Sequence, residues 1–162
     1  MTKPNTCTIC DFNPEDNFYI ATSEDRLVVA LWDPYSVSEG SFLVAPARHA
    51  ESIFAITPEE HMSLYGLAKA IAARVRDDHG FEDYNIGSNV GKAAGQLLEH
   101  PNMLFIPRRP GDVKEPRGGV RYVIPEEGDY IGNPKEPRQP GSNNDPVPAI
   151  EDVQLSPPEQ IQ

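Results

Sequence analysis

The sequence predicts an α+β domain of about five strands and one long helix, followed by a disordered tail. Three observations carry this prediction. Short runs of β-formers are bounded by turn residues, one segment has helix caps and helical spacing, and the last part of the chain is rich in proline. A chain of 162 residues is long enough for one domain with a buried core and some excess.

The strands are expected where β-branched and aromatic residues cluster. Residues 18–21 and 26–32 read as a hairpin, because a polar turn joins two runs of β-formers. Asp33-Pro34 ends the second strand, since proline cannot donate to the ladder. Further strands are expected at 41–45, which Pro46 closes, and at 84–89.

A last strand is expected in the apolar segment that stops at Pro107. Polar residues alternate at its start, and alternation by two places His100, Asn102 and Leu104 on one face of a strand. One face of this strand could therefore line a site.

The helix is expected between residues 57 and 80. Thr57 is a good N-cap, Pro58 suits the first helical position, and Glu60 completes a capping box. Gly80 can take the left-handed C-cap conformation. The apolar residues between these ends follow helical spacing and should face the core: Leu64, Leu67, Ala68, Ile71, Ala72 and Val75.

The composition changes at Gly132. The last 31 residues hold seven prolines, few aromatic residues and no hydrophobic period. Such a segment buries too little apolar surface to offset chain entropy. We therefore expect two regions, a folded domain at 1–131 and a disordered, proline-rich tail at 132–162.

The net charge of −11 argues against wrapping nucleic acid, because neutralising phosphates needs a basic surface. Five cations nevertheless lie between Arg108 and Arg121, and they form either a solvated loop or a flap that faces phosphate. The first residues have no apolar signal region, and no window reaches the length of a membrane span. A cytoplasmic protein is the expectation.

Cys7 and Cys10 are the only cysteines, and their Cys-x-x-Cys spacing suggests metal or redox chemistry before a disulfide. Zinc needs two further ligands, for which His49 and His100 are the plausible candidates. The alternative is a pair of free thiols beside two hydrogen-bonding histidines. The other histidines, His61 and His79, are expected at the surface or near helix ends.

The segment from Gly95 to Arg109 resembles the signature of the histidine triad (HIT) superfamily of nucleotide hydrolases and transferases. In that signature Gly-Gln leads into His-x-His-x-His, apolar residues and Pro-Arg, and the three histidine positions here read His100, Asn102 and Leu104. The resemblance covers roughly residues 7 to 131. Its further anchors are Cys7–Cys10, Asp33, Gly40–His49, Tyr84–Gly91 and Gly111–Arg121.

The resemblance implies a HIT-like fold with an antiparallel sheet, a homodimer, and a purine nucleotide or nucleoside phosphate as ligand. Family positions that contact nucleotide fall on Asp33, Asn89, Gly95, Gln96 and Asn102. The sequence alone, without the resemblance, indicates that Asp33 before proline is a turn residue. Leu97 replaces a residue that commonly offers a hydroxyl to phosphate. Zinc-containing relatives place their ligands at the positions of Cys7, Cys10, His49 and His100.

The altered triad bears directly on activity. In active family members the middle histidine attacks the α-phosphate, which needs an unprotonated ring nitrogen. Asn102 has no lone pair available for attack, and Leu104 cannot donate to developing phosphate charge. No catalytic residue is therefore assigned, and the sequence predicts a nucleotide-binding pseudoenzyme with structural zinc.

Two alternatives remain open for the function. One is a hydrolase-like protein with residual or rerouted activity on diadenosine tetraphosphate or a nucleoside phosphoramidate. The other is a structural zinc protein that binds no nucleotide. Turnover and nucleotide titration distinguish the three hypotheses.

Overall fold

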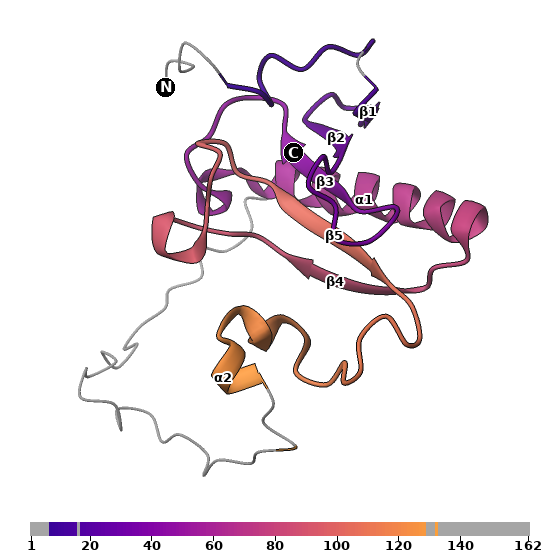
Figure 1. Ribbon diagram of the computed structural model, residues 1–162. Helices are drawn as coiled ribbons and strands as arrows, with labels where there is room; N and C mark the ends of the chain where they lie inside the picture. The colour runs from indigo at the N-terminus through magenta and orange to yellow at the C-terminus, as the bar shows by residue number, and fades with distance from the viewer. Residues whose placement is uncertain (1–6, 16, 129–131, 133–162) are drawn as a thin grey trace.

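The computed structural model describes residues 7–15, 17–128 and 132. Within these residues, five strands form one antiparallel sheet in the order β1-β2-β3-β5-β4 (Figure 1). The strands are β1 (Tyr19–Thr22), β2 (Val28–Trp32), β3 (Phe42–Pro46), β4 (Asp83–Gly87) and β5 (Met103–Arg108). The expected α+β architecture, with an antiparallel sheet and one long helix, is confirmed.

The long helix α1 (Pro58–His79) begins and ends as its caps dictate. The Thr57 side chain accepts from the Glu60 N–H, and the Glu60 side chain accepts from the Thr57 N–H. At the other end Gly80 takes the left-handed conformation at φ 75°, and its N–H donates to the Arg76 carbonyl. The capping box and the glycine cap are thus both realised.

One face of the sheet packs against α1. Residues of the helix at helical spacing, from Leu64 to Val75, bury against strand residues that alternate by two. The strand residues in this cluster are Val28, Ala30, Phe42, Val44 and Phe105. Figure 1 shows α1 lying across the sheet, so this face is closed to ligands.

The opposite face is covered by a smaller apolar cluster. Its strand members are Val29, Leu31, Leu43, Ala45 and, partly buried, Tyr19 and Leu104. The N-terminal segment adds Cys7, Ile9, Cys10 and Phe12 to the same cluster. Leu31, Leu43 and Leu104 are direct cross-strand neighbours on β2, β3 and β5. This second face also carries the candidate site.

Several boundaries differ from expectation, and Pro46, expected to close its strand, lies inside β3 opposite Val28. Strand β5 begins at Met103, so His100 and Asn102 precede it, and only Leu104 of the three triad positions lies on a strand. Pro107 lies inside β5, beside Tyr84 of β4, because this strand residue can pair without donating an N–H. Strand β4 ends at Gly87, two residues before Asn89, where the glycine-rich turn takes over.

Short helices complete the described part of the chain: η1 (Ile53–Ala55), η2 (Lys92–Ala94), η3 (Gly119–Val123) and α2 (Pro125–Gly128). Apart from Gly132, the predicted tail lies outside the described residues, and the domain boundary at 131 stays a prediction. Among the described helices, none is both long and apolar enough to cross a bilayer.

Candidate metal centre and nucleotide-binding face

Four potential metal ligands from distant parts of the chain meet at one end of the sheet. Cys7 and Cys10 lie on the N-terminal turn, His49 follows β3, and His100 precedes β5. Their ligand atoms all lie within 4.8 Å of one another. The structure therefore brings together the four residues that the sequence singled out.

The N-terminal turn presents both thiols to the same side. The Asp11 N–H donates to the Cys7 carbonyl at 2.9 Å, which closes a turn over 7–11. The Cys10 N–H lies 3.5 Å from Cys7 Sγ and donates to it. A metal ion at this turn could take both sulfur atoms as ligands.

His100 is fully buried, and its surroundings select one tautomer. Its Nε2–H donates to the Pro46 carbonyl at 2.8 Å, so Nδ1 carries the lone pair. Nδ1 lies 3.3 Å from Cys7 Sγ and 3.4 Å from Cys10 Sγ. Burial lowers the pKa of His100 and favours the neutral ring that binds metals.

His49 completes the cluster. Its Nδ1 lies 3.5 Å from Cys10 Sγ, and its ring stands edge-on to that of His100 at 5.3 Å between centroids. Zn–S and Zn–N bonds at tetrahedral angles separate sulfur from nitrogen by about 3.5 Å. The observed separations of 3.3, 3.4 and 3.5 Å match this value, so the donor set fits tetrahedral zinc.

Asp33 lies at the far end of the same sheet. It is half-buried, and its N–H donates to the Ser41 carbonyl, which extends the β2–β3 pairing by one step. Continued alternation places its side chain on the face of Leu31, opposite α1. Asp33 Oδ1 accepts from the Tyr35 N–H at 2.9 Å, so the expected turn geometry is present.

The glycine-rich loop before β5 is held by Gln96. The Gln96 side chain accepts from the Gly91 N–H at 2.8 Å and donates to the Leu98 carbonyl at 2.9 Å. Gly91 and Gly95 both have φ of 82°, which favours glycine. A Cβ on Gly95 would lie 3.9 Å from the exposed Asn89 amide, so the loop runs beside Asn89.

Asn102 and Leu104, at the second and third expected triad positions, both have structural partners. The side-chain amide of Asn102 donates to the His100 carbonyl at 3.4 Å. The backbone carbonyl of Asn102 accepts from Ser88 Oγ at 2.7 Å. Leu104 packs into the apolar cluster of the second face, beside Leu43. This position therefore contributes burial, and it has no polar group to offer a ligand.

Three arginines at and after the end of β5 are engaged with neighbouring side chains. Arg108 donates to Asp112 at 2.7 and 2.8 Å, and it also donates to Asn85. Arg109 lies over the Phe81 ring at 5.1 Å, and Arg117 donates to Glu115 at 2.7 Å. For these three arginines the geometry favours a loop with internal pairing over a flap that faces phosphate.

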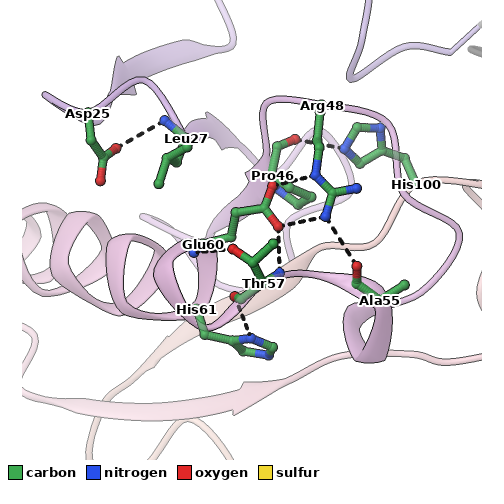
Figure 2. A network of polar contacts seen from close by, with 9 residues as sticks. All are labelled: Asp25, Leu27, Pro46, Arg48, Ala55, Thr57, Glu60, His61 and His100. Carbon is green, nitrogen blue, oxygen red and sulfur yellow. Dashed lines mark hydrogen bonds and ion pairs between the residues drawn. The ribbon is translucent and has the colours of Figure 1, made fainter. Parts of the chain in front are cut away.

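Sequence reasoning missed the contacts that surround the metal centre. Arg48 donates to the buried carboxylate of Glu60, and the Pro46 carbonyl accepts from His100 (Figure 2). A backbone carbonyl carries no sequence signal. Glu60 was identified only as a capping residue, although its near-complete burial requires a charged partner.

Comparison with known proteins identifies the class. The family model described as HIT domain matches residues 16–111, more than half of the chain. The chain belongs to the HIT domain family, which confirms the resemblance found in the sequence.

Individual relatives agree with this assignment. Protein hit of Bacillus subtilis is 31% identical over 108 residues, which cover 67% of this chain and 74% of that protein. Adenosine 5'-monophosphoramidase hnt1 of Schizosaccharomyces pombe is 27% identical over 128 residues, which cover 78% of this chain and 93% of that protein. The crystal structure of a HIT family member from Bacillus subtilis has 27% identity and a TM-score of 0.58, covering 80% of this chain and 94% of that one.

Proposed function

We propose that this protein is a nucleotide-binding HIT family member that is stabilised by structural zinc and has lost the family's covalent catalysis. The observation that carries the proposal is the pairing at position 102. There a carboxamide that bonds to the His100 carbonyl occupies the place of the attacking imidazole. An amide nitrogen has no lone pair for attack on phosphorus, so a nucleotidyl-enzyme intermediate cannot form through this residue.

The zinc proposal rests on geometry and protonation. Cys7, Cys10, His49 and His100 converge with separations suited to a tetrahedral ion, and the tautomer of His100 directs a lone pair at the thiols. Zinc bound by four protein ligands has no open position for a reactant. Its role would be to stabilise the fold.

The nucleotide proposal rests on the positions of two groups relative to one sheet. Asp33 is level with Ser41 on β3, whereas Met103, next to Asn102, pairs with Val44. Asn102 is one residue further along, so four residues of strand, about 13 Å, and two strand spacings, about 10 Å, separate the two backbone positions, which is roughly 16 Å in all. A nucleotide could bridge this distance with both side chains reaching towards it, so that its ribose contacts Asp33 while its phosphate lies beside Asn102. In this arrangement Asn89 and Gly95 would line the phosphate end, and Gln96 would fix the loop that carries them.

An adenine nucleotide is the first ligand to test, since one relative is named an adenosine 5'-monophosphoramidase. We expect AMP to bind the zinc-loaded chain in a calorimetric titration. The variant Asp33→Ala should weaken binding by about tenfold, the value of one lost hydrogen bond to a charged group. Glu24→Ala, an exposed acidic residue of the β1–β2 turn, is the matched control and should bind like wild type.

The relative's name also favours a second candidate, an active nucleotidyl hydrolase. Adenosine phosphoramidate and diadenosine tetraphosphate should then be consumed by the native chain, with a rate that Asp33→Ala lowers. Binding without turnover supports the pseudoenzyme, whereas turnover at a rate proportional to enzyme concentration contradicts it. A flat titration with adenine and guanine nucleotides would leave only a structural zinc protein.

A homodimer is part of the proposal. Strand β4 is at the edge of the sheet, and Ile86 on it is 44% exposed. An edge strand with an exposed apolar side chain can pair with a second copy. Light scattering on the purified chain should give twice the monomer mass, and Ile86→Lys should shift the protein towards the monomer. Cytoplasmic residence stays a prediction.

A further inference from the structure

An ion pair links the N-terminus of α1 to the loop that carries two groups of the metal centre. Arg48 lies in this loop, residues 46–49, and Glu60 lies in the first turn of α1. Figure 2 shows Arg48 reaching Glu60, with the Pro46–His100 hydrogen bond beside them. Neither charged side chain belongs to the four-residue cluster itself.

The ion pair has a fixed geometry. Arg48 Nε donates to Glu60 Oε1 at 2.6 Å, and a second guanidinium nitrogen donates to Oε2 at 2.8 Å. The same nitrogen donates to the Ala55 carbonyl at 3.1 Å. The Glu60 side chain is only 4% exposed, so surrounding residues restrict the position of its carboxylate. A two-point contact of this kind sets the direction of the guanidinium as well as its distance.

Residues on both sides of Arg48 along the chain contact the centre. His49 follows it directly and faces Cys10 at 3.5 Å. Pro46 lies two residues before it, and its carbonyl accepts the His100 Nε2–H. Fixing Arg48 therefore restrains one ligand directly and orients a second through the Pro46 carbonyl.

We propose that Arg48 and Glu60 are positioning residues of the metal centre. They preorganise the 46–49 loop, so that His49 and the Pro46 carbonyl are in place before metal binds. The inference rests on the zinc centre of the proposed function and adds the two side chains that set its affinity. Residues that orient metal ligands typically change metal affinity by about 10- to 100-fold when replaced.

A purely structural role for Glu60 is the competing explanation, since Glu60 also caps α1. The variants can separate the two roles. Glu60→Gln keeps an oxygen for the Thr57 N–H and so keeps the cap, but a carboxamide cannot accept both guanidinium donors. Thr57→Ala does the reverse, because it removes the side-chain cap on the Glu60 N–H and leaves the ion pair.

The test is zinc affinity of the full-length chain, measured by competition with a chromophoric chelator. Glu60→Gln and Arg48→Met should each bind zinc about 10- to 100-fold more weakly, with Arg48→Lys in between because it restores the charge without the two-point contact. The Co²⁺-loaded variants should show an altered d–d absorption spectrum, since a displaced His49 changes the ligand field. Arg74→Met, which breaks the exposed Arg74–Asp78 pair of α1, is the matched control and should leave zinc affinity unchanged.

The outcomes separate the two proposals. If Glu60→Gln and Thr57→Ala lower the melting temperature of the metal-free protein alike while zinc affinity stays at the wild-type value, the positioning role is wrong and the zinc centre stands. If wild type takes up no zinc, the centre and this inference both fail. Weaker zinc binding in Glu60→Gln, with wild-type affinity in Thr57→Ala, supports the inference.

Discussion

Restoring two histidines should restore the family's chemistry to this scaffold. The perturbation is the double variant Asn102→His, Leu104→His, which re-creates the middle and third positions of the triad. Position 102 lies directly before β5 and position 104 on it, facing away from α1, so both rings should enter the proposed nucleotide site. We expect the variant to release AMP from adenosine phosphoramidate at least about a hundredfold faster than the native chain.

The stability cost can be worked out from the contacts that are lost. Leu104 is partly buried beside Leu43, and full burial of a leucine contributes about 1.5–3 kcal/mol, so its replacement costs roughly 1–1.5 kcal/mol. Asn102 loses one hydrogen bond of 3.4 Å, worth about 0.5 kcal/mol, whereas its carbonyl still accepts from Ser88. The sum of about 2 kcal/mol should lower the melting temperature by roughly 5–10 °C and leave the variant folded.

The assay is AMP release under single-turnover conditions, where a covalent adenylate can be trapped by acid quench. The pair Asn102→Ala, Leu104→Ala is the control, since it removes the same contacts without adding an imidazole. If the double variant folds and binds AMP yet releases no product, the missing histidines do not explain inactivity. If the native chain releases AMP as fast as the double variant, the proposal that catalysis has been lost is wrong.

Three further outcomes follow from the geometry. Zinc at 100 times its Kd stabilises by about 2.7 kcal/mol, so chelation should lower the melting temperature of wild type but not of a variant with both cysteines replaced by serine. Gly40→Ala should cost about 2–3 kcal/mol in urea denaturation, because φ is 78° and the new Cβ would lie 3.1 Å from Val75, whereas Gly66→Ala, which meets nothing within 4 Å, should not destabilise. The Arg108 guanidinium holds the pKa of Asp112 well below its ordinary value. The stability from this carboxylate is therefore complete above about pH 4 and lost as pH falls through the folded-state pKa, and Arg108→Met should return the carboxyl pKa seen by NMR towards about 4.

Most of the fold could be predicted because its signals are local. Thr57 and Gly80 marked the ends of α1 to within a residue, since a capping box and a left-handed glycine act through their own neighbours. The apolar positions of the helix followed for the same reason. The start of β5 was less predictable, because alternation in the sequence continues through His100 and Asn102 while the pairing with β3 begins at Met103.

The parts of the candidate site that depend on residue type could be predicted from the sequence. The four residues of the metal cluster could be named from residue type and resemblance, and the structure brings their ligand atoms within 4.8 Å. The Pro46 carbonyl and the Arg48–Glu60 pair could not be named. They depend on how the loop after β3 meets the helix N-terminus, a contact between elements that no local pattern encodes.

The N-terminal segment connects the candidate metal centre with the apolar cluster of the second face. Cys7 and Cys10 would bind zinc, and the same segment lays Ile9 and Phe12 into the apolar cluster that contains Leu104. A metal that holds this segment also holds the cover over the second face of the sheet. Leucine at position 104 adds to that cover, whereas a histidine there would bring a polar ring into it. Bound zinc would therefore stabilise the protein whether or not any reaction takes place, and Leu104 adds apolar packing to the same cluster that the metal would hold in place.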